Sequence, residues 1–300
     1  MKKMNITNWF FIFAMFGSLL LTSCYDDYVD DYDSSVYFSS QKPLRTIIAD
    51  RNMSIKVGVA ISGKRSVDMS DWATFEIDES LLAGTGLELL PESYYTLSSP
   101  DMMKVRDKAV AIADVTVSFT DAFYSDSLSM TKHYAIPFKL LETNCDQVNA
   151  DKMNSIVAVK YVSTYAGTYY AQGTVETLDE SGQVVVTDTY STIDLSKNII
   201  REVSTVDVNH LIRQGVGNNP TSTSTESVAL SIEGAQVTVS TVSTIANAID
   251  IIDGSGTYDI DAHSMKLTYS YVKDGVTYRV NETLTLRQDI LLDLRFEEWG

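Results

Sequence analysis

The stretch MKLTYSYVKDGVTYRVNETLTL, residues 265–286, carries the clearest structural signal in the sequence. Apolar or aromatic side chains alternate with polar ones on both sides of the pair Asp274-Gly275. Successive side chains of a β-strand point to opposite faces, so this alternation is typical of a strand with one buried face. Asp-Gly between two alternating runs is a strong hairpin signal. The stretch therefore predicts an antiparallel hairpin whose core face includes Tyr269 and Tyr271.

The same period of two recurs along the chain. It covers residues 55–61, 115–119, 134–140, 156–162, 169–176, 184–190, 228–232 and 237–242. Pro137 cannot donate to a ladder, so its strand is expected at a sheet edge or a bulge. Helix signals are confined to short turns near residues 78–82 and 207–212. Many short strands and few helices predict an all-β protein, built as sandwiches or barrels.

The amino terminus resembles an export signal. Lys2 and Lys3 precede an apolar run, residues 9–21, that is shorter than the roughly 20 residues needed to cross a bilayer. The run ends at Leu21-Thr22-Ser23-Cys24, which resembles the lipobox of bacterial lipoproteins. The resemblance implies cleavage after residues 1–23 and acylation of Cys24, palmitate included. The alternative is an ordinary secretory signal with a chance cysteine.

An acidic stretch follows the cysteine. Residues 25–33 contain five Asp, and such a like-charged run stays extended and solvated. Residues 24–35 are therefore expected to be an acidic tether. They also resemble the surface-export signal of Bacteroidetes lipoproteins, which implies a lipid-anchored protein of the outer membrane that faces the extracellular side. The alternative is a plain spacer.

Charge and cysteine content narrow the function classes. The chain has 23 basic and 40 acidic side chains, a formal net charge of −17. Phosphate backbones are repelled by such a chain, so nucleic acid is excluded as an expected partner. Cys24 and Cys145 are the two cysteines, and lipidation of the first leaves the second without a disulfide partner within the chain. Stability is therefore expected to come from apolar burial, for which the length suffices.

The chain is long enough for two domains after signal removal. A strand-like run ends near residue 162, and Tyr165-Ala166-Gly167-Thr168-Tyr169 begins a new pattern. The sequence therefore predicts domains at residues 36–163 and 164–300. Residues 218–225 are a polar, low-complexity loop.

Several N-terminal segments resemble a known domain. They include Val36-Tyr37-Phe38, the segment from Leu90 to Leu97, and the segment from Asp121 to Leu128. Together they resemble the Bacteroidetes surface-lipoprotein domain that precedes the catalytic domain in some secreted endo-β-N-acetylglucosaminidases. The resemblance implies an immunoglobulin-like β-sandwich without catalytic activity.

The C-terminal half also resembles a known domain. Tyr165-x-Gly167-x-Tyr169, Gly256-Thr257-Tyr258 and the terminal segment from Leu294 to Trp299 are similar to a companion antiparallel β-barrel-like, lipocalin-like domain. Such pairs belong to polysaccharide-utilisation systems. The resemblance therefore implies a carbohydrate-binding surface protein with glycan-import or glycosidase partners, and it supplies no binding residue.

Catalytic motifs are absent from the sequence. It contains no G-x-S-x-G, no H-E-x-x-H, no P-loop and no G-x-G-x-x-G. We therefore expect no enzyme, no cofactor and no metal. Asp259, Asp261 and His263 share one strand face and could in principle bind Ca²⁺ or Zn²⁺, but a solvated strand edge is the favoured interpretation.

Aromatic side chains remain as candidates for glycan binding. An aromatic ring covers the apolar face of a sugar, while polar side chains meet its hydroxyls. In Tyr169-Tyr170, one ring must leave the core if the sheet is half buried. Tyr170, Trp72 and Trp299 are the predicted binding residues, with docking of the chain end as the alternative for Trp299. The alternative function is an adhesin or fimbria-associated structural subunit.

Overall fold

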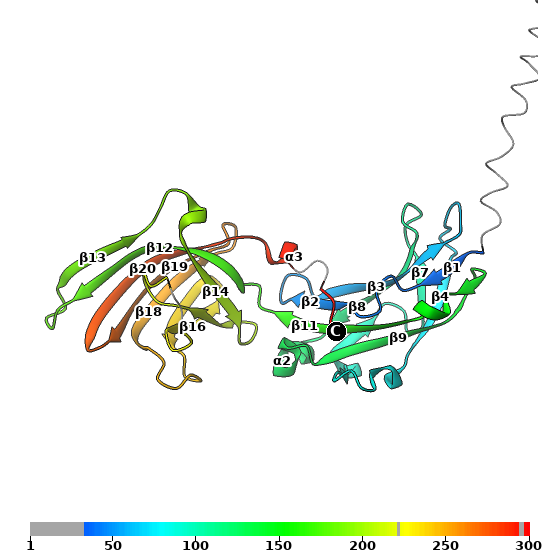
Figure 1. Cartoon of the computed structure of the whole chain (residues 1–300), viewed down its shortest axis with the longest axis horizontal. Helices are drawn as coiled ribbons and strands as arrows, with labels where there is room; N and C mark the ends of the chain where they lie inside the picture. The colour runs from blue at the N-terminus through cyan, green and yellow to red at the C-terminus, as the bar shows by residue number, and fades with distance from the viewer. Residues whose placement is uncertain (1–32, 221–222, 294–296) are drawn as a thin grey trace, which may run out of the picture.

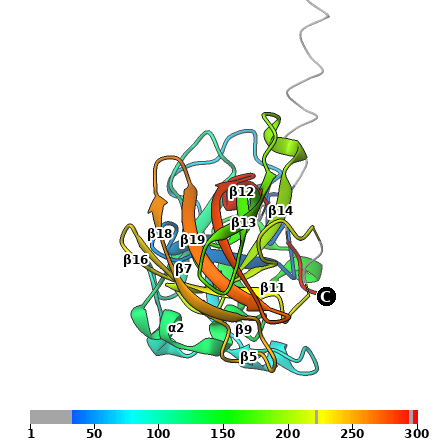
Figure 2. The same ribbon diagram turned by 90° about the vertical axis from the view of Figure 1, so that its left-hand side faces the viewer.

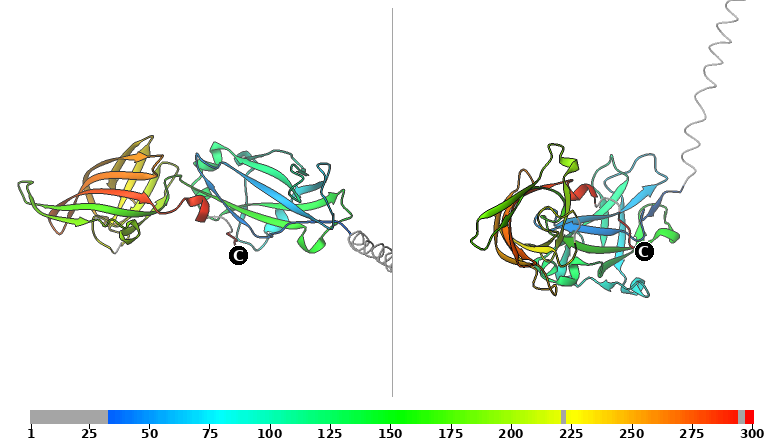
Figure 3. Two further views of the ribbon diagram at one scale, coloured as in Figure 1. Left: turned by 90° about the horizontal axis from the view of Figure 1, so that it is seen from above. Right: turned by 60° about the vertical axis from the view of Figure 1, so that its left-hand side comes forward.

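A computed structural model describes residues 33–220, 223–293 and 297–300 (Figure 1). These residues form an 11-stranded sheet in the first half of the chain and a nine-stranded sheet in the second, so the all-β prediction is confirmed. Figure 3 shows the two sheets end to end. Cys24 and the expected signal peptide lie outside the described residues. No helix of the described part is long and apolar enough to cross a membrane.

The N-terminal sheet is a single curled sheet. In spatial order it contains β10 (Gln147–Val148), β1 (Ser35–Tyr37), β3 (Ser54–Ser62), β8 (Ile112–Phe119), β7 (Met102–Val105), β4 (Trp72–Ile77), β9 (Tyr134–Thr143), β11 (Asn154–Val162) and β2 (Leu44–Ile48). Because β7 joins β8 to β4, the sheet curls and both limbs contribute to one apolar core. Val115 of β8 and Phe138 of β9 are both fully buried in it. The immunoglobulin-like sandwich expected for this half stays a prediction.

Short elements complete this half. They are β5 (Glu88–Leu89), β6 (Tyr95–Leu97), η1 (Glu79–Leu82), η2 (Glu92–Tyr94), α2 (Asp121–Ser125), η3 (Ser127–Met130) and η4 (Ala150–Lys152). The helical turn expected near residues 78–82 is confirmed as η1. The Asp78 carboxylate begins it by accepting a hydrogen bond from the backbone N–H of Ser80 at 3.1 Å.

Of the two expectations for the Pro137 strand, the sheet edge is wrong, whereas an irregularity is present, since the register of β9 against β4 shifts between Ala73 and Phe75. β9 lies inside the sheet, between β4 and β11. The Pro137 carbonyl accepts a hydrogen bond from the backbone N–H of Asp78, the residue just after β4 ends. Its nitrogen faces the same side, because N–H and C=O of one residue point the same way in an antiparallel strand. The N–H group that Pro137 lacks would therefore point past the end of β4, where no strand residue needs it as a donor.

The C-terminal sheet closes into an eight-stranded antiparallel barrel, visible from its outer end in Figure 2. Its strands are β12 (Gly167–Leu178), β14 (Ile199–Thr205), β15 (His210–Gln214), β16 (Ser227–Glu233), β17 (Gln236–Thr241), β18 (Asp250–Asp259), β19 (Ser264–Lys273) and β20 (Val276–Leu286). Pairing of β12 with β20 closes the ring. Outside the ring, β13 (Val184–Tyr190) pairs with β12. The short helices η5 (Leu195–Lys197) and α3 (Ile290–Asp293) complete this half.

Of the local predictions for the barrel, the hairpin and the buried tyrosines are confirmed and the helical turn is not. The Asp274-Gly275 hairpin is confirmed: both residues have positive φ, 53° and 77°, and join β19 to β20. Tyr269 and Tyr271 are buried, as alternation predicts. The helical turn expected at residues 207–212 is wrong, because the chain makes a tight turn at Asp207 and then enters strand β15.

Side chains fill the barrel interior, including a buried ionic cluster. The Arg213 guanidinium is fully buried, contacts the Glu282 carboxylate and donates to the Tyr269 hydroxyl at 2.8 Å. Arg201, also buried, donates to the carbonyls of Gly217 and Asn219 at 2.9 and 2.7 Å. An eight-stranded barrel is just wide enough for side chains to fill it. The ionic cluster occupies part of this interior, and the groove described below lies on the outside of the barrel.

The chain end returns to the N-terminal sheet (Figure 1). Glu297 accepts a hydrogen bond through its carbonyl from the Leu44 N–H at 2.9 Å, and the Trp299 N–H donates to the Lys42 carbonyl at 3.0 Å. The Trp299 indole N–H donates to the Ile156 carbonyl at 2.7 Å, and the ring is 6% exposed. Residues 297–299, a segment that we call the latch, thus pair with the chain at the start of β2 through an isolated antiparallel bridge between Glu298 and Pro43.

Candidate ligand-binding groove on the barrel

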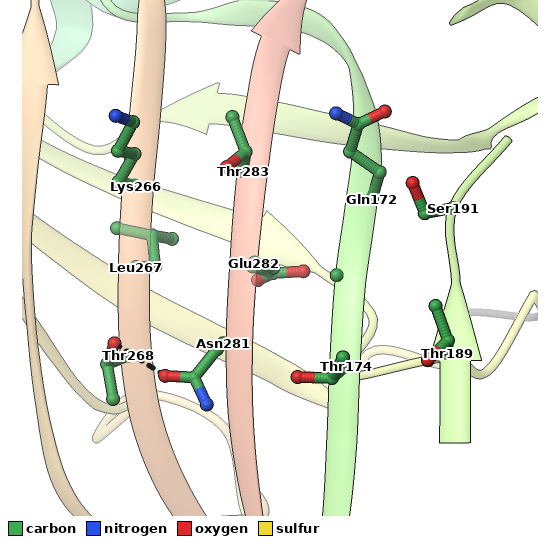
Figure 4. A pocket seen from close by; sticks show the side chains of 11 residues that line it. Gln172, Thr174, Thr189, Ser191, Lys266, Leu267, Thr268, Asn281, Glu282 and Thr283 are labelled. Carbon is green, nitrogen blue, oxygen red and sulfur yellow. Dashed lines mark hydrogen bonds between the residues drawn. The ribbon is translucent and has the colours of Figure 1, made fainter. Parts of the chain in front are cut away.

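The outer face of the barrel presents aligned polar side chains. Along the middle of β19, β20 and β12, inward residues such as Leu267, Glu282 and Ala171 are buried, and outward residues such as Lys266, Asn281 and Gln172 are polar. The strand register aligns them in two rows (Figure 4). The first row is Lys266, Thr283 and Gln172. The second is Thr268, Asn281 and Thr174, continued by Thr189 of β13. Neighbouring strands lie about 4.8 Å apart, so each row offers polar groups at that spacing.

These rows form the floor of a groove because β12 changes partners along one edge. Residues 167–171 of β12 pair with β14, whereas residues 173–178 pair with β13. Thr189 and Ser191, at the end of β13, stand beside the floor. The resulting groove has a volume of about 460 Å³. It is open and shallow rather than enclosed.

Gly173 permits the close approach of strands beneath the groove. A Cβ at this position would lie 2.1 Å from the Asn281 carbonyl oxygen and 2.8 Å from the Glu282 Cα. Its partner on β13 is Tyr190, whose hydroxyl donates to Glu282 at 2.9 Å. Burial, followed by the neighbouring Glu282 carboxylate, raises the pKa of Tyr190, so this hydroxyl stays protonated as a donor. The buried ionic cluster therefore fixes the floor of the groove from below.

The groove offers both donors and acceptors. Thr268 donates through its hydroxyl to the Asn281 amide oxygen at 2.9 Å, which leaves the Asn281 amide N–H groups free to donate. Gln172, Thr283 and Lys266 have no hydrogen-bond partner for their side chains among the residues that the structure describes. A ligand with many hydroxyls, each both donor and acceptor, matches this inventory.

Tyr170 adds an aromatic ring beside the groove. Alternation along β12 turns Tyr169 inward, where it is 1% exposed, and turns Tyr170 outward, where it is half-buried. The prediction that the pair splits between the two faces is confirmed. Tyr170 lies on the same strand face as Gln172, in the adjacent row with Thr285 of β20 and Ser264 of β19.

The other two predicted residues lie elsewhere. Trp72 begins β4 of the N-terminal sheet and is half-buried. Trp299 is buried in the latch against Leu44, Leu82 and Leu87, so its ring presents no open face to a ligand. The structure therefore separates Trp72, Tyr170 and Trp299 into three places, and it brings only Tyr170 beside the groove.

Sequence reasoning missed the polar rows. The sequence alternation does predict that Gln172, Thr283 and Asn281 point outward from their strands. Their alignment depends on the pairing of β12 with β20, two strands that are distant in sequence. No local pattern marks that pairing.

Within the described ranges, no group of three His, Cys, Asp or Glu side chains could hold a metal ion. The segment from Asp259 to His263 is a turn. The Asp259 carboxylate accepts hydrogen bonds from the backbone N–H groups of Asp261 and Ala262, both at 3.0 Å. His263 has a φ of 45° and its ring contacts the Tyr258 hydroxyl at 3.3 Å. These interactions account for the conformation of the turn.

The fold and the groove define an all-β protein with two sheets, the second closed into a barrel with a polar outer face. Two family models match the chain, one described as an N-terminal domain over residues 32–147 and one described as a C-terminal domain over residues 153–285. No curated protein matches the chain.

Several solved structures from Bacteroides ovatus are similar to this chain to different degrees. A crystal structure of a protein of unknown function superposes with a TM-score of 0.70 at 21% identity, covering 86% of this chain and 96% of that one. A multidomain protein that includes DUF1735 gives a TM-score of 0.41 at 13% identity, over 85% and 94%. Another, described provisionally as carbohydrate binding, gives 0.31 at 10%, over 89% and 86%. The first establishes a shared fold, and the other two are too distant to carry an argument.

Proposed function

We propose that the protein is a cell-surface lipoprotein that binds glycans and does not cleave them. The observation that carries this proposal is the groove on the barrel, where rows of hydroxyl and amide groups lie beside the outward ring of Tyr170. Sugars present an apolar C–H face and a rim of hydroxyls, which this combination matches.

The shallow groove implies modest affinity at each site. A site of about 460 Å³ that is open on one side leaves much of an oligosaccharide in water. Many copies on one cell surface would raise the overall avidity through effective concentration. Weak single sites are therefore compatible with capture of long polysaccharides.

Location belongs to the proposal as well. The lipobox-like segment that ends at Cys24 and the acidic residues 25–33 support acylation and display on the outer membrane. We further propose domain limits of 36–163 and 164–300, with an immunoglobulin-like first domain and a lipocalin-like second domain. In this arrangement the barrel is presented to the medium, where it could pass glycans to import or glycosidase partners.

Affinity electrophoresis of the soluble fragment 25–300 in gels that contain different polysaccharides tests the proposal. We expect at least one polysaccharide to retard the protein. The Tyr170→Ala and Gln172→Ala variants should each lose several-fold in affinity for it, because they remove a stacking ring and an amide from the groove side. Gln236→Ala is the matched control, since Gln236 is exposed on the same barrel face but does not line the groove. Retardation that all three variants leave unchanged would refute the groove as the site.

One observation favours the alternative of an adhesin or fimbria-associated subunit. β13 is the last strand of its sheet path, and Val184, Val185 and Val186 are 44%, 63% and 48% exposed. An exposed apolar edge strand can pair with another chain. Polymers of fragment 25–300 that appear in analytical ultracentrifugation, and that are absent in the Val185→Lys variant, would support the structural alternative. A monomer at all concentrations would speak against it.

A further inference from the structure

A second pocket lies on the N-terminal sheet, around the outward face of β7. Its volume is about 520 Å³, and its lining includes Met69, Ser98, Ser99, Met102, Lys104 and Arg106. On the neighbouring strand β4, Trp72 is the cross-strand partner of Lys104, and Thr74 is the partner of Met102. Side chains of such pairs lie about 5 Å apart at Cβ. The indole of Trp72 is therefore next to the pocket wall.

Lys104 differs from the cations around it. Arg106 pairs with Asp114 at 3.0 Å, Lys108 with Asp68 at 3.4 Å, and Lys64 with Asp71 at 2.6 Å. Lys104 is exposed and has no ion-pair partner within the described part of the chain. Its ammonium group is therefore available to a ligand at this pocket.

The pocket presents mainly donors. The Ser98 hydroxyl oxygen accepts hydrogen bonds from the Arg106 guanidinium at 3.1 Å and from the Thr116 N–H at 3.0 Å, so its own proton is free to donate. Ser99 adds a second hydroxyl, and Lys104 adds three N–H donors. Among the residues that the structure describes, no carboxylate lines the pocket. The complementary ligand is rich in acceptors, as a carboxylate or sulfate group is.

Apolar groups flank these donors. Met69 is 54% exposed and Met102 is half-buried, and both line the pocket beside the Trp72 strand. Thioether and indole surfaces suit the C–H face of a sugar ring. A free inorganic anion would make no use of them.

We infer that this pocket binds an anionic saccharide, a sugar that bears a carboxylate or sulfate, with Lys104 as its counter-charge and Trp72 beside the ring. The inference concerns a different domain from the barrel groove and does not depend on it. An exposed charge pair contributes up to about 1 kcal/mol at low salt. Wild-type protein should therefore prefer an acidic oligosaccharide over its neutral counterpart by about five-fold.

Tryptophan fluorescence and saturation-transfer NMR titrations of fragment 25–300 test this inference. The probes are trigalacturonate, neutral galactotriose and inorganic sulfate, each at about 20 mM and about 500 mM salt. We expect trigalacturonate to bind about five-fold more tightly than galactotriose at low salt and equally at high salt. Lys104→Gln should abolish the preference, and Trp72→Ala should weaken both sugars.

Lys108→Gln is the matched control, because it removes a nearby lysine that already has a partner. It should keep the full preference, as should Gln236→Ala, because the Gln236 side chain lines neither the groove nor this pocket. A preference that survives Lys104→Gln, or no preference in the wild-type protein, would overturn the inference. Sulfate alone binding as tightly as trigalacturonate would also overturn it, because the sugar ring would then contribute nothing.

Discussion

Neutralising Glu282 should destabilise the barrel far more than neutralising a similar carboxylate on its surface. Glu282 is 4% exposed and faces Arg213, which is 0% exposed. The Glu282→Gln variant keeps the size of the side chain and one acceptor oxygen, and it removes the charge. Arg213 would then retain three neutral acceptors, the Tyr269 hydroxyl, the Gly215 carbonyl and the new amide oxygen, and no carboxylate. A buried guanidinium without a counter-charge is the physical source of the expected loss.

The magnitude follows from burial. Removing one partner of a buried ion pair costs about 3–5 kcal/mol, and the retained hydrogen-bond acceptor places Glu282→Gln near 3 kcal/mol. For a domain of this size, about 4 °C per kcal/mol gives a fall in Tm of about 12 °C. Glu176→Gln is the control. Glu176 pairs with Arg279 at 2.7 Å on the outer face, where both side chains are partly exposed, so its loss should be at most about 1 kcal/mol.

Differential scanning calorimetry of fragment 25–300 measures both variants. Tryptophan fluorescence reports the N-terminal sheet independently, because Trp72 and Trp299 both lie on that sheet and the described barrel residues 167–286 contain no tryptophan. We expect the calorimetric transition of the barrel to fall in Glu282→Gln and to change little in Glu176→Gln, with the tryptophan fluorescence transition unchanged in both. Equal shifts for the two variants would show that the buried cluster tolerates an unpaired charge, and the reasoning would fail.

Three further predictions concern the latch, the groove and an acidic side chain. Trp299→Ala should lower the free energy of unfolding of the N-terminal sheet by about 3 kcal/mol in urea, because it empties a buried site. Trp299→Phe should restore about half of this loss. An unchanged unfolding midpoint in Trp299→Ala would mean that the latch is not docked in solution. Gly173→Ala should lower the thermal midpoint of the barrel and abolish glycan retardation together, since a Cβ would collide with the backbone of β20; normal stability would contradict that close approach. Hydrogen bonds from the Tyr134 hydroxyl at 2.7 Å and the Tyr94 hydroxyl at 3.1 Å hold the pKa of Asp126 below its usual range. The contribution of Asp126 to stability is therefore present above about pH 3.9, and it is lost as the pH falls through the lowered pKa. Acid titration followed by circular dichroism should show this loss below about pH 4 in the wild-type protein and a smaller one in Asp126→Asn; identical curves would exclude Asp126 as a source.

Local patterns predict much of the barrel strand by strand. The alternation around Asp274-Gly275 is sufficient to predict the hairpin, because period and turn geometry are properties of neighbouring residues. The same logic predicts that Tyr169 and Tyr170 face opposite sides. The same logic fails at residues 207–212, where polar residues that could cap a helix form a turn instead. It also fails to place the Pro137 strand inside the sheet, a position that is possible because β4 ends before it needs a hydrogen bond from the Pro137 nitrogen.

The candidate site residues also divide into those that local sequence can predict and those that depend on distant segments. Tyr170 is predictable as an outward ring, whereas the strand that Trp72 begins is not among the predicted strands. Trp299 has no local signal that distinguishes an exposed platform from a buried anchor. Its burial depends on the β2 edge, which is formed by residues at the other end of the chain.

The sequence by itself determined the β-rich class, the predicted export signal and the face on which each side chain of a strand lies, because these depend on residues close together in the chain. Tertiary structure decided which strands meet. Closure of β12 on β20 aligns Gln172 with Thr283 and Thr174 with Asn281, and the return of the latch buries Trp299. Such contacts gain their free energy only when distant segments are brought together, so no local pattern can specify them.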